Sequence, residues 1–170
     1  MKKNFNQLIN KLTYSARSLN NKAIKDSFSE LKKYYHKTQT LKYEKNFKSG
    51  YWKNPPQWEV KSGILYDPKG NVIANYIRNP LELWTHSTSF SGYIKKEDLI
   101  KNHIFTDKNR PGSTPFHFKN QYRENLSEWG FCLPYNLVKK LKKGKYKVNI
   151  KTNFSKSELQ SAYLEKKGKN

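Results

Sequence analysis

Four histidines and one cysteine are the residues of this chain that could bind a metal ion or act in nucleophilic catalysis. The histidines are His36, His86, His103 and His117, and none of them lies in a His-Glu-x-x-His or His-x-His pattern. A thiolate zinc site needs several cysteines, and this chain has only Cys132. The sequence therefore predicts no catalytic residue, no metal site and no cofactor in this chain.

Cys132 and His117 could still form a nucleophile and its base if the fold brought them together. A lone cysteine beside aromatic residues is more typical of a small buried side chain, and Trp129 and Phe131 precede Cys132 closely. We therefore interpret Cys132 as structural. A hydrolase built on His117, Arg123 and Cys132 stays open as a minor hypothesis.

The segment from Phe116 to Pro134 has an unusual density of aromatic, amide and small residues without a helical or strand period. Such a density is typical of a tightly packed junction or of a binding surface. Trp129 and Phe131 are expected to be at least partly buried, whereas Arg123 can pair with a carboxylate or stack on a ring. The candidate structural or interaction residues are His117, Gln121, Tyr122, Arg123, Trp129, Phe131 and Cys132.

The chain has 170 residues, enough for one domain or a small domain with an appendage, and a net charge of +21. Lysine-rich and aromatic-rich composition suits binding to nucleic acid through phosphate contacts and ring stacking. However, an A/T-rich genome also raises the lysine content of its proteins. Arginine, the residue that reads nucleic acid most specifically, is scarce here. We expect the charge to be diffuse, so a nucleic-acid partner is the alternative rather than the main hypothesis.

A single cysteine excludes an internal disulfide and fits the reducing cytoplasm. The N-terminus begins like a signal peptide, but Asn6, Gln7 and Asn10 interrupt the apolar run that should follow. No stretch approaches the roughly 20 apolar residues of a membrane-spanning helix. The sequence thus predicts a cytoplasmic protein without a membrane span.

The N-terminal part of the chain has apolar residues at helical spacing. Two helices are predicted, the second from about residue 22 to residue 35 with Asn20 or Asn21 as its cap. Their apolar stripes are Phe5, Leu8, Ile9 and Leu12 in the first helix, and Ile24, Phe28, Leu31 and Tyr35 in the second. These two short helices need a partner surface to bury their stripes.

Extended segments follow. The turn Asp67-Pro68-Lys69-Gly70-Asn71 predicts a hairpin over residues 58–77. Further elements are predicted as a strand over 81–88, a break at Ser91-Gly92, a helix over 95–103, one or two helical turns over 136–141 and a strand over 145–151. The fold class is α+β: an N-terminal helical segment followed by a mainly antiparallel β domain with short helices.

Together these segments resemble a known family. The resemblance rests on Arg17-Ser18, Pro56 with Trp58, Ser87 to Gly92, Pro115-Phe116-His117-Phe118, Asn120-Gln121-Tyr122-Arg123 and Trp129-Gly130-Phe131-Cys132. Over residues 15–159 the chain resembles the N-terminal portion of aminopeptidase-like proteins related to zinc exopeptidases, which are often encoded beside surface-polysaccharide genes.

The resemblance implies a division into three parts. Residues 1–48 would begin a discontinuous peptidase-like domain, residues 49–155 would be an inserted, mainly β domain, and residues 156–170 a polar tail. The family's zinc ligands come from a later segment that this chain does not contain, so zinc is expected only in a full-length member. The chain is then expected to be a non-catalytic gating or assembly module, truncated or split, whose partner is a separate catalytic chain or a second copy of itself.

Overall fold

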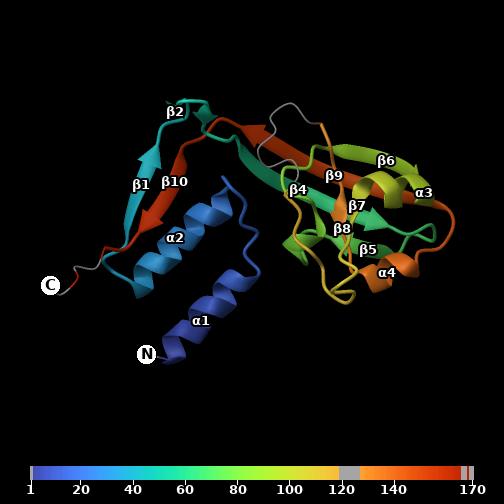
Figure 1. The fold of residues 1–170 in the computed structure, drawn as a ribbon, viewed down its shortest axis with the longest axis horizontal. Helices are drawn as coiled ribbons and strands as arrows, with labels where there is room; N and C mark the ends of the chain where they lie inside the picture. Colours follow the sequence, from blue (N-terminus) through green and yellow to red (C-terminus); the bar gives the residue numbers. More distant parts are fainter. Residues whose placement is uncertain (1, 119–126, 166–167, 169–170) are drawn as a thin grey trace. The chain divides into compact units, whose positions relative to one another are not determined.

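The computed structural model describes residues 2–118, 127–165 and 168 of the chain (Figure 1). Two N-terminal helices, further short helices and mainly antiparallel sheets confirm the predicted α+β class. The chain forms two compact units: unit 1 contains Met1–Trp58 and Phe154–Asn170, and unit 2 contains Glu59–Asn153. The predicted domain bounds at residues 48 and 155 stay a prediction, because a division into compact units does not show which residues form an inserted domain.

Unit 1 consists of two helices and two small antiparallel sheets. Helices α1 (Lys2–Thr13) and α2 (Lys22–Tyr34) contact each other, and α2 contacts strand β10. Strand β1 (Gln39–Tyr43) pairs with β10 (Leu159–Tyr163), and β2 (Lys48–Ser49) pairs with β3 (Trp52–Lys53). Strand β10 lies in the predicted polar tail, where the sequence analysis expected no strand.

Asn21 begins helix α2 as the sequence predicts. Its side-chain oxygen accepts a hydrogen bond from the backbone N–H of Ile24 at 3.0 Å, which is the arrangement of a helix N-cap. Its side-chain nitrogen donates to the carbonyl oxygen of Ala16 at 2.6 Å. One side chain therefore fixes both the start of α2 and the loop before it.

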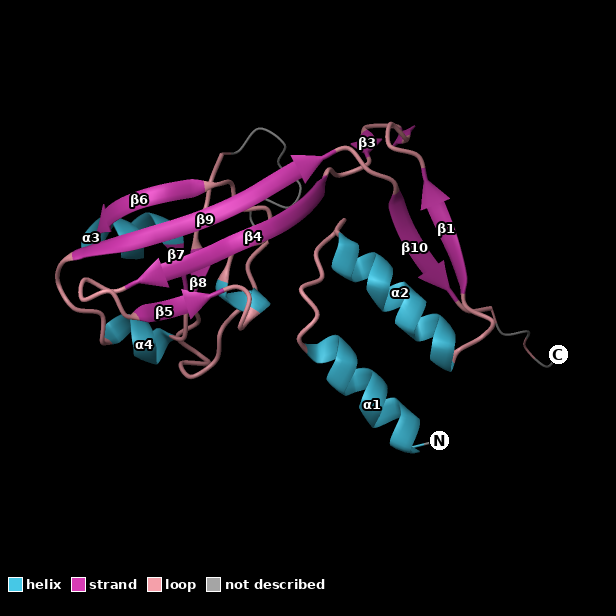
Figure 2. Cartoon of the chain, turned by 180° about the vertical axis from the view of Figure 1, so that it is seen from behind, coloured by secondary structure: helices cyan, strands magenta, loops and turns pink. Residues whose placement is uncertain are grey.

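Unit 2 is built on a four-stranded sheet with the strand order β5-β4-β9-β6. Its strands are β4 (Gln57–Tyr66), β5 (Val72–Asn75), β6 (Phe90–Lys95) and β9 (Lys145–Ser155). Figure 2 shows these strands in front, with the short helices α3 (Lys96–Asp98) and α4 (Tyr135–Lys139) behind them. The face toward the helices carries the core, which includes the fully buried Leu65, Tyr146, Val148 and Ile150.

The predicted hairpin is formed by β4 and β5. One side-chain oxygen of Asp67 accepts hydrogen bonds from the backbone N–H groups of Lys69 and Asn71, both at 2.8 Å. Gly70 has a φ of +90°, a conformation that side chains disfavour. The Asp-Pro-Lys-Gly-Asn sequence therefore determines this turn locally.

The strand predicted over residues 81–88 is wrong. Residues Pro80–Glu82 form a 3₁₀ turn in which the side chain of Asn79 accepts a hydrogen bond from the N–H of Leu81 at 3.2 Å. At the other end His86 has a φ of +60°. A capped turn and a residue with positive φ both interrupt an extended strand.

The break predicted at Ser91-Gly92 is also wrong, because both residues lie inside β6. Ser91 pairs with Asn149 and Gly92 pairs with Val148 of β9. Backbone pairing with a long neighbouring strand outweighs the weak strand propensity of serine and glycine. The helix predicted over 95–103 is found as α3 followed by a π-helical turn at Leu99–His103.

Candidate functional site at an aromatic junction

Rings from separate segments of unit 2 pack into one cluster, which we name the aromatic junction. The parallel strands β7 (Ile104–Phe105) and β8 (Phe131–Cys132) carry two of its members, with Ile104 paired to Phe131 and Phe105 paired to Cys132. The junction consists of Trp84, Phe90, His103, Phe105, His117, Trp129 and Phe131. It therefore gathers much of the segment that the sequence analysis singled out.

Trp129 lies at the centre of a stack of rings. The His103 ring is parallel to it at a centroid distance of 3.8 Å, and the Phe90 ring stacks at 4.3 Å. The Nδ1 atom of His103 also lies 2.8 Å from the carbonyl oxygen of Trp129. Because a carbonyl oxygen only accepts, Nδ1 carries the proton of this hydrogen bond. Trp129 is buried, as predicted.

Trp84 connects the rings around Trp129 and Phe131 with the stacked rings of Phe105 and His117. Its backbone N–H donates to the carbonyl oxygen of Gly130 at 2.9 Å, and its Nε1 donates to that of Phe131 at 3.0 Å. The Trp84 ring also meets the His117 ring edge-on at 4.6 Å. Trp84 thus satisfies its own polar groups while it packs against the Trp-Gly-Phe-Cys segment.

Cys132 and His117 are brought together, but not as a nucleophile and its base. The backbone of His117 hydrogen-bonds the Cys132 thiol, and the His117 ring stacks on Phe105 at 4.3 Å. Burial raises the pKa of Cys132 to about 12, so the thiol stays protonated at neutral pH. Only a thiolate attacks efficiently, so the described geometry favours the structural interpretation of Cys132.

His86 is a feature that the sequence analysis missed. Its side chain is buried, and burial lowers its pKa to about 4, so the ring is neutral at pH 7. Among the described residues it is the only one other than glycine with a positive φ. Histidine tolerates this conformation better than most residues, but no sequence pattern marks it.

The predicted candidate residues have different outcomes. Trp129, Phe131 and Cys132 are buried together, and His117 contacts them through Trp84 and its own backbone. Gln121, Tyr122 and Arg123 lie outside the described residues. Whether the segment binds a partner therefore stays a prediction.

The sequence analysis also gave no role to His103 or Gly130. Nothing in the sequence pairs His103 with Trp129. Gly130, however, stands among aromatic residues, and an isolated glycine in an extended segment often marks a close backbone approach. That signal was available from the sequence.

In the described part of the chain, no group of three His, Cys, Asp or Glu side chains is placed to hold a metal ion. Over the same residues, no helix is long and apolar enough to cross a membrane.

Comparison with known proteins supplies a fold match and a family. The chain resembles a crystal structure from Clostridium acetobutylicum described as a "putative peptidase", with 20% sequence identity and a TM-score of 0.81. The match covers 94% of this chain but only 36% of the other, so the chain spans about a third of that protein's length. At this identity the match establishes the shared fold.

A comparison with curated proteins gave no match. Residues 57–153, more than half of the chain, match the family described as a domain of unknown function (DUF2172), and the chain therefore belongs to that family.

Proposed function

We propose that this chain is the non-catalytic, N-terminal and inserted portion of a peptidase-like protein, and that it gates substrate or holds an assembly together. The fold shared with one third of the Clostridium acetobutylicum protein supports this proposal, because the remaining two thirds of that protein can hold a catalytic part. We propose that zinc belongs to a full-length member of the peptidase-like family rather than to this chain, so we derive no metal-dependent step here.

The observation that carries the proposal is the incomplete core of unit 1. Among its described side chains, the buried hydrophobic ones are only Leu8 and Trp58, whereas unit 2 has a core of its own. Many apolar side chains of unit 1 are instead exposed. They include Phe5, Ile9, Tyr35, Leu41, Phe47, Trp52, Phe154, Tyr163 and Leu164.

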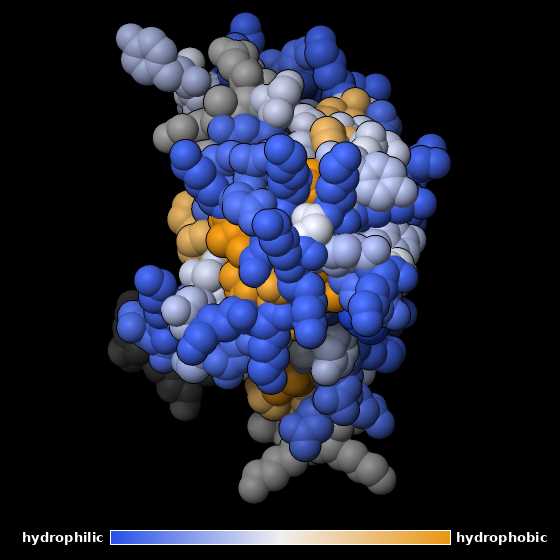
Figure 3. Space-filling model, turned by 90° about the vertical axis from the view of Figure 1, so that its right-hand side faces the viewer, coloured by the Kyte–Doolittle hydropathy of each residue, from blue (hydrophilic) through white to orange (hydrophobic). Residues whose placement is uncertain are grey.

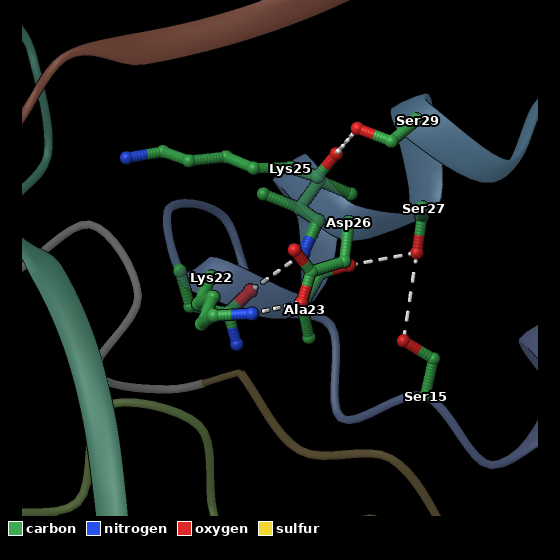
Figure 4. Close-up of polar contacts among 9 residues, drawn as sticks. Ser15, Lys22, Ala23, Lys25, Asp26, Ser27 and Ser29 are labelled. Atoms are coloured by element: carbon green, nitrogen blue, oxygen red, sulfur yellow. Dashed lines mark hydrogen bonds and ion pairs between the residues drawn. The ribbon is translucent and has the colours of Figure 1, made fainter. Parts of the chain in front are cut away.

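Polar contacts help to hold α2 in place (Figure 4). The hydroxyl of Ser27, the buried residue of α2, donates to the carbonyl oxygen of Ala23 at 2.7 Å and lies 3.5 Å from the hydroxyl of Ser15. On another side of α2, Lys25 donates to the side chains of Gln57 at 3.0 Å and Ser157 at 2.8 Å. Such contacts orient the helix but bury little apolar surface. In the predicted stripe of α2, Ile24, Phe28 and Leu31 are partly exposed and Tyr35 is exposed.

A surface of this kind favours association with further polypeptide. Apolar side chains that stay exposed in an isolated unit are stabilised when a partner removes them from water. We propose that this partner is the catalytic part of the peptidase-like protein, in the same chain or in a separate one. The resemblance to proteins encoded beside polysaccharide genes extends the proposal to surface-polysaccharide synthesis, and the single reduced cysteine supports a cytoplasmic location.

Hydrogen exchange tests the proposal. The chain is measured alone and together with the catalytic part of a peptidase-like protein, supplied as a separate polypeptide. We expect the amides of α1, α2, β1 and β10 to exchange faster than those of β4 and β9 in the isolated chain, and to become protected in the complex. Leu41→Asp should weaken the complex, and Ile77→Asp, an exposed position in unit 2, serves as the control. Full protection of unit 1 in the isolated chain, with no complex formed, would argue against the proposal.

A further inference from the structure

A row of three side chains crosses the sheet of unit 2. Tyr66 of β4 pairs with Val72 of β5, and Tyr93 of β6 pairs with Lys147 of β9. The ammonium group of Lys147 lies 5.6 Å from the centroid of the Tyr66 ring, which joins the two pairs across β4 and β9. The row therefore consists of Tyr66, Lys147 and Tyr93.

This row lies on the face of the sheet that the described helices do not cover. Along β9, Lys145 and Lys147 are exposed while Tyr146 and Val148 are buried, because alternate side chains point to opposite faces. Tyr93 is 67% exposed. Figure 2 shows the strands of unit 2 in front of its helices when the molecule is seen from this side.

Lysines lie next to the row, because Lys95 of β6 pairs with Lys145 of β9, two residues along the strands from Tyr93 and Lys147. Strands β5, β6 and β9 contain no Asp or Glu, and the sequence contains none between Glu128 and Glu158. No ion pair to the lysines of the α4–β9 loop and adjoining β9 is found among the described residues. These lysines are Lys139, Lys140, Lys142, Lys143, Lys145 and Lys147. Figure 3, which views the end of unit 2 where this loop lies, shows mainly hydrophilic side chains around a smaller apolar area.

The loop that carries these lysines is fixed in place. Leu141 is buried, and its carbonyl oxygen accepts a hydrogen bond from the Lys96 ammonium group at 2.6 Å. The backbone N–H of Lys96 donates to the carbonyl oxygen of Gly144 at 3.1 Å, and the Tyr146 hydroxyl donates to that of Lys142 at 2.8 Å. These lysines therefore lie on an ordered surface, whereas the expectation that the charge of the whole chain is diffuse stays a prediction.

We propose that this sheet face binds single-stranded nucleic acid. Tyr66 and Tyr93, on either side of Lys147, offer ring faces on which bases stack, and the neighbouring lysines contact phosphates. An ordered β surface with exposed aromatic rings and cations suits this ligand, because every base has a face that can stack whatever its sequence. Lysine contributes a point charge rather than the planar fork of arginine, so the binding has little sequence preference.

The test is fluorescence anisotropy of the full chain with a labelled thymidine oligonucleotide of about 15 residues, at about 50 and 200 mM salt. We expect binding that weakens steeply with salt. Tyr93→Ala should weaken binding about tenfold, because ring stacking is lost. Its control is Tyr14→Ala in unit 1, which removes a ring that is 75% exposed and should leave binding unchanged.

A pair of double variants separates the surface from the net charge. Lys145→Glu with Lys147→Glu should weaken binding at least tenfold, whereas Lys37→Glu with Lys42→Glu in unit 1 changes the net charge equally and should have a much smaller effect. Equal loss in both doubles would overturn the proposal. So would equally tight binding of polyglutamate or of an acidic polysaccharide, since neither polymer offers bases. These outcomes leave the association with a peptidase-like polypeptide untouched, so the two proposals fail separately.

Discussion

Gly130 lies so close to the indole ring of Trp84 that a Cβ atom at position 130 would be 2.4 Å from the Trp84 Cε2 atom. Real Cβ contacts of this length do not occur, and the ring is buried, so it cannot swing into solvent. The two residues therefore fix how the Trp-Gly-Phe-Cys segment docks in unit 2.

Gly130→Ala should lower the free energy of unfolding by about 3 kcal/mol, because a methyl group forced into a filled core displaces the ring or the backbone. Urea unfolding followed by tryptophan fluorescence measures the change. Gly112→Ala is the matched control, because nothing lies within 4 Å of its added Cβ atom. If both variants unfold at the same urea concentration, the contact of Gly130 with Trp84 is not as close as described.

Trp129→Ala should destabilise the chain by about 3–5 kcal/mol, the range for removing a large buried side chain. The change deletes the ring between His103 and Phe90 and leaves a cavity. Thermal unfolding gives the readout, with Trp52→Ala as the control because that ring is 43% exposed. An unchanged melting temperature for Trp129→Ala would show that the ring belongs to a binding surface instead.

Acid should destabilise the fold partly through His86. Its pKa is about 4 in the folded chain and 6.5 for an ordinary histidine, so the unfolded chain binds the extra proton between these pH values. The stability that comes from burying the neutral His86 ring is fully present above about pH 6.5 and is lost as the pH falls toward 4. The two pKa values differ by about 2.5, which corresponds to about 3 kcal/mol.

Replacing the histidine tests this dependence. His86→Asn keeps a residue that tolerates positive φ but does not titrate, so its stability should vary less between pH 6.5 and pH 4 than that of the parent chain. The control is His36→Asn, an exposed position. Identical pH profiles for the parent and His86→Asn would exclude His86 as the source.

Cys132 should react very slowly with iodoacetamide in the folded chain. Its thiol is fully buried, and burial raises its pKa to about 12, so little thiolate is present at pH 8. Mass spectrometry of the alkylated protein follows the reaction, and it should become rapid in denaturant. Because the chain has one cysteine, every added group reports on this site. Fast labelling of the native chain would show that the site opens.

Short-range patterns in the sequence determined much of the fold. The amide cap at Asn21, the Asp67 to Asn71 turn and the alternation of Tyr146, Val148 and Ile150 with lysines each act over a few residues. Such interactions are local, so spacing alone predicted helix α2, the β4–β5 hairpin and strand β9. The burial of Trp129, Phe131 and Cys132 followed from their side-chain chemistry.

Only the tertiary structure decided what these elements contact. The stack of His103 on Trp129 and the pairing of Ser91-Gly92 in β6 join residues far apart in the chain, and no local pattern encodes such contacts. The same holds for the row of Tyr66, Lys147 and Tyr93, which strand order alone brings together. Net charge is a property of composition, and the run of lysines from Lys139 to Lys147 is visible in the sequence. The fold decides that Leu141 and Tyr146 are buried while the lysines between them are exposed.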